Sequence, residues 1–228
     1  MMELFVLSFL LCRVLNQAQV STSAPKLIYR DGEAIAFCFE PKNCNLTGTV
    51  SWGSRSQCSK VLSSVDLSVN KIAGSVSDIS SLSGCSKLQS LNLSKNLMEF
   101  KGVSKPLGLS LQVIDLSFNR ISGPEVMSWI LSAGCGELVE FNVSSNNISG
   151  TDPESLKSCS SLQLFDISRN NFSGVLPMDT LVSLSSLKTL MLAFNNFVGE
   201  LPESLSELTN LEKFMLLHLH KSIASPSP

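Results

Sequence analysis

The sequence has few of the side chains on which catalysis depends. Its 228 residues include only two histidines, His218 and His220, which stand near the end of the chain. A serine or cysteine nucleophile would therefore have no histidine base in the rest of the protein, and two histidines without a third ligand are a weak metal signal. Gly134 and Gly136 lack the third glycine of a dinucleotide motif, and no phosphate loop or kinase signature is present. We expect no enzyme, catalytic residue, metal or cofactor.

The sequence also lacks a dominant charge and a long apolar run. The chain has 17 lysines and arginines and 19 aspartates and glutamates, which gives a net charge of −2. The basic residues are scattered along the chain. This balance argues against nucleic acid as a partner. The apolar run from Leu4 to Leu15 has the length of a secretory signal and is too short to span a membrane. Residues 1–24 are predicted to be a signal peptide, the alternative being an apolar N-terminus that is buried or wrongly joined.

What the sequence does contain is a repeat. The pattern LxxLxLxxN, with other apolar residues allowed, begins at Leu62, Leu88, Leu111, Leu138, Leu162 and Leu187, and a seventh unit opens at Leu211. Starts about 23 to 27 residues apart fall within the period of leucine-rich repeats. Each unit contributes one short strand to a parallel sheet and buries its leucines against its neighbours. The sequence predicts an α/β leucine-rich-repeat solenoid, a curved horseshoe or superhelix with the sheet on its concave face.

The repeat divides the chain into segments. Residues 25–61 are expected to cap the open end of the apolar ladder, and residues 62–216 to form six full repeats and one incomplete repeat. In the seventh unit, Leu219 occupies the position of the asparagine, and a run rich in serine and proline follows. Residues 217–228 are therefore predicted to be an aberrant or disordered tail.

The last residue of the repeat pattern is an asparagine with a structural role. Its amide can pair with backbone groups of the turn that would otherwise be buried without a partner. This ladder comprises Asn70, Asn96, Asn119, Asn146, Asn170 and Asn195.

A second row of side chains stands between the last two apolar residues of each strand and is expected to face solvent. It comprises Asp66, Asn92, Asp115, Asn142, Asp166 and Met191, our candidate concave binding face. The three aspartates could suggest a paired-acid site, but the asparagines between them favour a solvated ladder.

Cysteines and glycosylation sequons point to an oxidising, extracellular compartment. A bridge between Cys44 and Cys58 is expected in the cap. Cys85, Cys135 and Cys159 each precede the first leucine of a repeat by three residues, and we interpret them as buried free thiols rather than as disulfide partners or metal ligands. N-x-S/T sequons occur at Asn45, Asn92, Asn142, Asn147 and Asn171.

Longer phrases of the sequence carry a family resemblance. "LSAGCGELVEFNVSSNNISG" and "NNFSGVLPMDTLVSLSSLKTLMLAFNNFVGELPESL" resemble plant extracellular leucine-rich-repeat proteins, most closely the ectodomain of brassinosteroid receptor kinases. "LIYRDGEAIAF" is similar to the helix that opens the cap in that family. The resemblance covers about Lys26 to Leu216. The family's steroid-binding island domain, membrane helix and kinase have no counterpart in the sequence, so no hormone-binding residue is carried over.

The resemblance implies a binding protein of plant signalling. The first hypothesis is a secreted or cell-surface module, resembling a truncated receptor, that recognises another protein or a peptide, such as a co-receptor; a steroid is not expected without the island domain. The second is a fragment of a receptor-like kinase, which would place the chain at the plasma membrane. The third is an inhibitor of wall-degrading enzymes, which is also built from repeats of this length.

Overall fold

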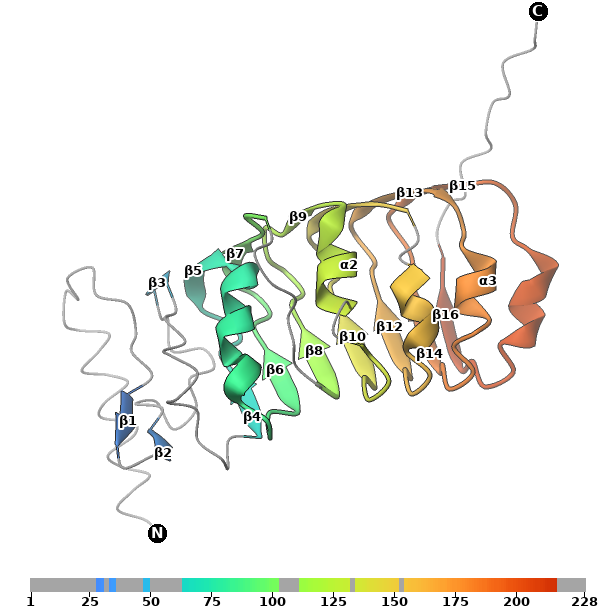
Figure 1. The fold of residues 1–228 in the computed structure, drawn as a ribbon. Helices are drawn as coiled ribbons and strands as arrows, with labels where there is room; N and C mark the ends of the chain where they lie inside the picture. Colours follow the sequence, from blue (N-terminus) through green and yellow to red (C-terminus); the bar gives the residue numbers. More distant parts are fainter. Residues whose placement is uncertain are drawn as a thin grey trace, which may run out of the picture.

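The computed structural model describes residues 28–30, 33–35, 47–49, 63–102, 111–131, 134–151 and 154–216. Figure 1 shows the repeats stacked side by side, with one strand of each in a long parallel sheet. The sheet has the order β16-β14-β12-β10-β8-β6-β4, so that spatial neighbours belong to consecutive repeats. The predicted leucine-rich-repeat solenoid is confirmed. Its strands are β4 (Ser64–Asp66), β6 (Ser90–Asn92), β8 (Val113–Asp115), β10 (Glu140–Asn142), β12 (Leu164–Asp166), β14 (Thr189–Met191) and β16 (Lys213–Met215).

Each strand of this sheet is three residues long, and β4 to β14 turn the middle residue into the core, because successive side chains point to opposite faces. In β16 the middle residue, Phe214, is exposed. These middle residues are stacked in register through the sheet: Phe141 pairs with Ile114 on one side and with Phe165 on the other. The rings of Phe141 and Phe165 are 5.9 Å apart and nearly parallel. A single short strand is unstable in water, so the stack of repeats provides the burial that each strand lacks.

Two smaller parallel sheets follow the asparagine turns. One has the order β3-β5-β7, with strands β3 (Thr47–Thr49), β5 (Lys71–Ser75) and β7 (Leu97–Glu99). The other has the order β15-β13-β11-β9, with strands β9 (Ser122–Gly123), β11 (Asn147–Gly150), β13 (Asn171–Val175) and β15 (Asn196–Val198). Gly174, at a φ of +88°, adopts a backbone that residues with a Cβ avoid, and a Cβ there would meet Thr151 at 3.3 Å.

Short helices close the repeats on the side of the core opposite the long sheet. They are η2 (Val76–Gly84), α2 (Glu125–Leu131), η3 (Glu154–Ser158), α3 (Met178–Leu181) and η4 (Glu203–Glu207). Their buried side chains, such as Ile79, Met127 and Leu156, join the strand residues in one continuous hydrophobic core. The opposite side of the long sheet therefore stays free of helices among the described residues, as Figure 1 shows.

The expectation of a helix at the start of the cap is wrong. Ile28–Arg30 forms β1 and Glu33–Ile35 forms β2, which pair antiparallel. Isoleucine and tyrosine favour strands, and an Asp-Gly pair between two such segments is typical of a tight hairpin. The predicted signal peptide, the Cys44–Cys58 bridge, the Asn45 sequon, the two histidines and the tail 217–228 lie outside the described residues.

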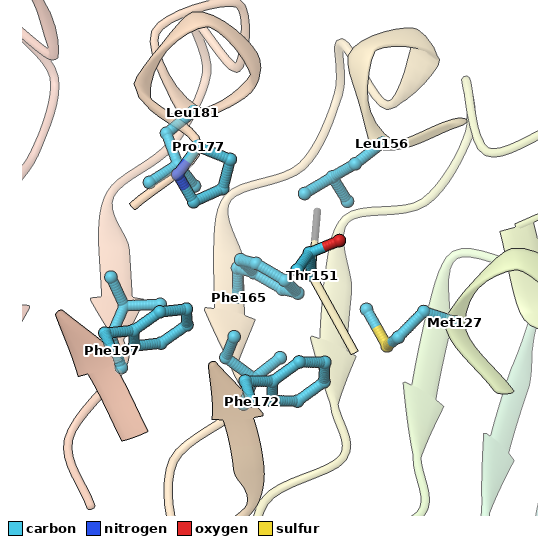
Figure 2. A pocket seen from close by; sticks show the side chains of 10 residues that line it. Met127, Thr151, Leu156, Phe165, Phe172, Pro177, Leu181 and Phe197 are labelled. Atoms are coloured by element: carbon cyan, nitrogen blue, oxygen red, sulfur yellow. The ribbon is translucent and has the colours of Figure 1, made fainter. Parts of the chain in front are cut away.

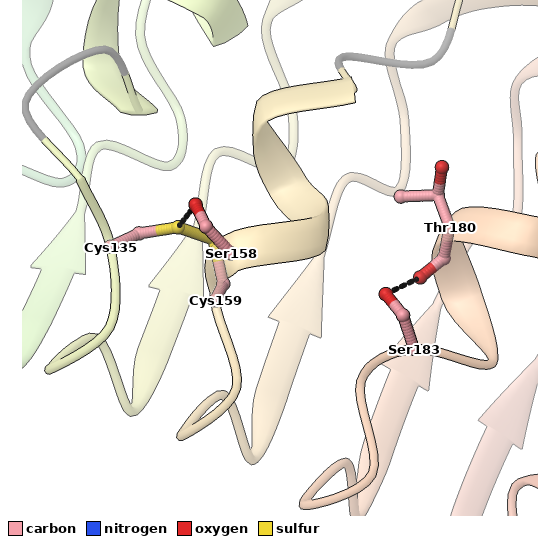
Figure 3. The surroundings of a disulfide bond; sticks show 5 residues. All are labelled: Cys135, Ser158, Cys159, Thr180 and Ser183. Atoms are coloured by element: carbon pink, nitrogen blue, oxygen red, sulfur yellow. Dashed lines mark hydrogen bonds between the residues drawn. A yellow bond between two sulfur atoms is a disulfide. The ribbon is translucent and has the colours of Figure 1, made fainter.

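The interpretation of the three repeat cysteines as free thiols is also wrong. Cys135 and Cys159 form a disulfide across neighbouring repeats, with their Cα atoms 4.7 Å apart, and Cys85 is disulfide-bonded as well. Figure 3 shows the hydroxyl of Ser158 beside the bridge, 3.5 Å from the Cys135 sulfur. Stacking brings equivalent positions of consecutive repeats within the distance that a disulfide spans. The sequence signal for this bond was that Cys135 and Cys159 each stand three residues before the first leucine of their repeat, Leu138 and Leu162.

Candidate ligand-binding face

The exposed side of the seven-stranded sheet, which we call the sheet face, presents two rows of side chains. They flank the middle residue of each strand, which is buried in every strand except β16. The first row comprises Ser64, Ser90, Val113, Glu140, Leu164, Thr189 and Lys213, and the second comprises Asp66, Asn92, Asp115, Asn142, Asp166, Met191 and Met215. The structure thus brings the six predicted binding-face residues together in one continuous row across neighbouring strands.

Five residues of the second row have a local structural task that sequence reasoning missed. The side-chain oxygen of Asp66 accepts a hydrogen bond from the backbone N–H of Ser68, at 2.9 Å. Asn92, Asp115, Asn142 and Asp166 accept in the same way, at 2.9 to 3.0 Å, from the residue two positions ahead. Such bonds hold the backbone as it leaves the strand. The signal was an aspartate or asparagine two residues before a serine in each of these repeats.

The carboxylates of this row do not form an acid pair. Along the sheet, Asp66 lies opposite Asn92, and Asp115 lies between Asn92 and Asn142. Each aspartate is therefore separated from the next by an amide, so two strand spacings of about 4.8 Å each lie between carboxylates. This geometry suits solvated side chains that can contact a partner.

The chemistry of the sheet face changes along the solenoid. In the first four repeats the two rows are mostly polar, with Glu140 exposed near the middle of the sheet. In the last repeats Met191 and Met215 succeed the aspartates, and the exposed Lys213 follows Thr189. A partner that crosses several strands therefore meets polar, then apolar and cationic side chains in a fixed order.

The ladder asparagines sit behind the sheet face and join consecutive repeats. The amide of Asn170 donates to the carbonyls of Ile167 and Ser168 in its own turn and to that of Val143 in the preceding repeat. Its oxygen accepts from the backbone of Ile148, also in the preceding repeat, at 2.9 Å. Asn96, Asn119, Asn146 and Asn195 bridge their repeats in the same way.

The residue before each ladder asparagine has a left-handed backbone, which the sequence did not reveal. These residues are Val69, Lys95, Phe118, Ser145, Arg169 and Phe194, with φ between 54° and 60°. This conformation lets their N–H groups reach the next repeat: that of Arg169 donates to the carbonyl of Ala193 at 2.9 Å. It also projects their side chains outward, and Phe118 and Phe194 are about half exposed.

The sequons divide between two surfaces. Asn147 and Asn171 are exposed at the first positions of β11 and β13, beyond the asparagine turns. Asn92 and Asn142 lie partly buried in the sheet face itself.

One internal gap among the described residues is a feature of packing. Figure 2 shows side chains of α2, η3, β12, β13, α3 and β15 around it, among them Met127, Leu156 and Phe165. The space, about 20 Å³, is close to the volume of one water-sized sphere.

The described residues lack two further features, a metal-binding cluster and a membrane-spanning helix. They contain no cluster of three or more histidine, cysteine, aspartate or glutamate side chains that could hold a metal ion. None of the helices in that part of the chain has the length and hydropathy to span a membrane.

Comparison with known proteins agrees with this architecture. The family model described as Leucine rich repeat matches residues 136–197, and a second one, described as Leucine Rich Repeat, matches residues 110–129. Both segments lie in the stacked repeats.

The curated relatives are plant receptors. The chain is 46% identical over 115 residues to the systemin receptor SR160 of Solanum peruvianum, a match that covers 50% of this chain and 10% of the receptor. It is 48% identical over 110 residues to the protein BRASSINOSTEROID INSENSITIVE 1 of Arabidopsis thaliana, covering 47% of this chain and 9% of that protein. The match therefore spans about a tenth of the length of either relative.

Solved structures of plant receptors have the same fold. A TDR receptor is 25% identical with a TM-score of 0.66, covering 76% of this chain and 29% of the receptor. The plant peptide hormone receptor RGFR1, solved in complex with RGF2, is 28% identical with a TM-score of 0.54. The match covers 72% of this chain and 29% of that receptor. The chain is a leucine-rich-repeat solenoid whose repeats are similar in sequence to those of brassinosteroid and systemin receptors and similar in structure to plant receptor ectodomains.

Proposed function

We propose that this chain is an extracellular recognition module of the receptor type, which binds a peptide or another protein on its sheet face. The observation that carries the proposal is the sheet face itself. It crosses seven strands, no described helix covers it, and its side chains change from polar to apolar and cationic along the solenoid. Repeat proteins use such extended surfaces to hold a partner across several units.

The comparisons and the disulfide support the same proposal. The relatives carry the names of receptors, and RGFR1 was solved with a bound peptide hormone. The Cys135–Cys159 bond suits an oxidising compartment outside the cytosol. A peptide or protein ligand fits the sheet face, because side chains from seven neighbouring strands can contact an extended partner across several repeats.

The chain is also proposed to work as one part of a membrane receptor, since its match covers only 10% of the systemin receptor. On that view the plasma membrane is its location and a co-receptor is among its partners. A transcript that continues in frame into a membrane helix and a kinase would establish this form. A transcript that ends with this sequence would favour a secreted module.

The test of the module is capture of a ligand that depends on the sheet face. The tagged chain is secreted from plant cells, and bound peptides and proteins are identified by mass spectrometry. The variant Glu140→Arg with Thr189→Arg places two bulky cations on the sheet face, whereas the matched control Ser128→Arg places one on the exposed side of α2. A partner kept by the wild type and the control but lost by the double variant supports the proposal. Equal capture by all three chains contradicts it.

A further inference from the structure

The ends of the sheet strands form a second exposed surface beside the sheet face. It consists of the residues immediately before and after the ladder asparagines. Six of these are exposed cationic or aromatic side chains, which we call the basic rim: Lys71, Lys95, Phe118, Arg120, Arg169 and Phe194. They come from five different repeats, so the basic rim extends along most of the solenoid.

Charge is segregated between the basic rim and the sheet face. The six turns, residues 68–72, 94–98, 117–121, 144–148, 168–172 and 193–197, contain four cations and no aspartate or glutamate. Three aspartates stand instead on the neighbouring sheet face, at Asp66, Asp115 and Asp166, and Asp78 and Asp179 stand in the helices. A chain with a net charge of −2 therefore presents one positive edge. Such an edge attracts an anionic partner and orients it away from the aspartates.

The cations of the basic rim are arranged over its aromatic rings. The Arg169 guanidinium lies 4.3 Å from the centre of the Phe194 ring, and the Lys95 ammonium lies 5.7 Å from that of Phe118. Cation–π contacts at exposed sites contribute about 0.5 to 1 kcal/mol each, so they favour this arrangement of cation and ring. The only ion pair among the described residues joins Lys101 to Glu99, so the four rim cations keep their donors available.

The two cation–aromatic pairs are a duplicated feature at a defined spacing. Phe118 and Phe194 belong to the third and sixth repeats, and neighbouring strands are about 4.8 Å apart, so about 14 Å separates the two positions. An extended peptide advances about 3.4 Å per residue, so about four residues cover that distance. Side chains an even number of residues apart point to the same side of an extended chain, so both can contact the rim.

We propose that the basic rim binds an extended acidic peptide segment that carries two apolar side chains about four residues apart. Each apolar side chain packs on one phenylalanine, and the carboxylates between them pair with Arg120 and Arg169. A carboxylate beyond the first apolar side chain pairs with Lys95, which lies one repeat before Phe118. This inference rests on the proposed function, because it names the chemistry of the ligand that such a module takes. It adds an edge contact to the sheet face, whose aspartates repel the same carboxylates.

The test measures binding of defined probes to the full chain after enzymatic trimming of N-glycans, because Asn147 and Asn171 lie beside the rim. The probe is a synthetic peptide of about ten glutamates in which two phenylalanines stand about four residues apart. Its controls are a peptide of the same composition with adjacent phenylalanines, and polygalacturonate as an anionic sugar chain. The first peptide is expected to bind most tightly, with an affinity that falls as salt rises.

Paired variants assign the binding to the rim. Arg169→Gln with Phe194→Ser, or Lys95→Gln with Phe118→Ser, is expected to weaken the probe about tenfold. The matched control, Lys188→Gln with Leu201→Ser, removes the same charge and an equally exposed apolar side chain elsewhere and should leave binding unchanged. Unchanged melting temperatures verify that all variants are folded.

The outcomes separate this inference from the proposed function. The inference is overturned if the probe does not bind, or if the spacing control or polygalacturonate binds equally well. It is also overturned if neither rim variant weakens the binding of the probe. If a natural partner is still captured through the sheet face, the proposed function stands while the rim proposal fails. If the peptide binds with the expected spacing but no partner depends on the sheet face, the rim proposal stands and the sheet-face function fails.

Discussion

The side-chain amide of Asn170 donates to the carbonyl of Val143, 2.9 Å away in the preceding repeat, and its oxygen accepts from the backbone of Ile148. One side chain therefore satisfies backbone groups in two consecutive repeats. Asn170→Leu leaves these groups without partners, at a cost of about 1 to 3 kcal/mol for each buried group. We expect a large loss in the free energy of unfolding, measured by denaturant titration.

The neighbouring residue provides the control for this prediction. Asn171 is exposed, and within the described residues its side chain accepts a hydrogen bond from Asn196 at the surface. Asn171→Leu should therefore change stability by less than about 1 kcal/mol. Both variants are compared with glycans removed, since Asn171 lies in a sequon. Equal destabilisation by the two substitutions would contradict the role assigned to the ladder.

Val69 is a β-branched residue in a left-handed conformation, with a φ of 58°. This backbone costs about 1 to 2 kcal/mol for an ordinary residue, and asparagine tolerates it better. Val69→Asn should stabilise the protein by about 1 kcal/mol and raise its melting temperature by about 2 to 4 °C. Val175→Asn, at an exposed strand position, should give no increase. A lower melting temperature for Val69→Asn would show that packing of the valine outweighs its backbone strain.

The Cys135–Cys159 disulfide closes a loop with a sequence separation of 24 residues. Its removal in Cys135→Ala with Cys159→Ala should reduce the free energy of unfolding by about 3 kcal/mol, because the unfolded chain gains conformational freedom. Ser158→Ala keeps the bond and should have a small effect. Peptide mapping without reductant should recover the two cysteines in one linked fragment. Two separate alkylated peptides from the secreted protein would refute the bond.

Glycans are predicted at Asn147 and Asn171, which are exposed beyond the strands. Asn92 and Asn142 lie in the sheet face, so sugar attached there would cover the centre of the proposed binding surface. Mapping of glycopeptides from the secreted chain decides between the two pairs. Full occupancy of Asn92 and Asn142 would exclude a ligand from the second to fourth repeats of the sheet face. An absence of sugar at every sequon would argue against secretion.

The sequence was sufficient to predict the repeat architecture, because a pattern of leucines and asparagines that occurs six times in succession favours the stacked arrangement of a solenoid. It also placed the binding-face row on neighbouring strands. The Cys135–Cys159 bond was missed because each cysteine was judged by its own burial, although stacking makes equal positions in consecutive repeats neighbours.

Other features depend on geometry that the pattern does not encode. The left-handed residues are Val, Lys, Phe, Ser, Arg and Phe, so no residue type indicates their backbone. The pairing of Arg169 with Phe194 requires side chains that are 25 residues apart in sequence to project from the same edge. The start of the cap was assigned to a helix by resemblance, whereas Ile28, Tyr29 and Ile35 belong to a strand pair.

The proposed function requires that a ligand contacts the sheet face and not the helices. Photo-crosslinking tests it most directly, with a benzophenone amino acid placed either at Glu140 on the sheet face or at Ser128 on α2. Both side chains are exposed, so the two probes have equal access to solvent. In extracellular fluid from the source tissue, the probe at Glu140 should form a discrete adduct with a peptide or protein, and the probe at Ser128 should form none. The same adduct at both positions, or an adduct at Ser128 alone, would contradict the claim.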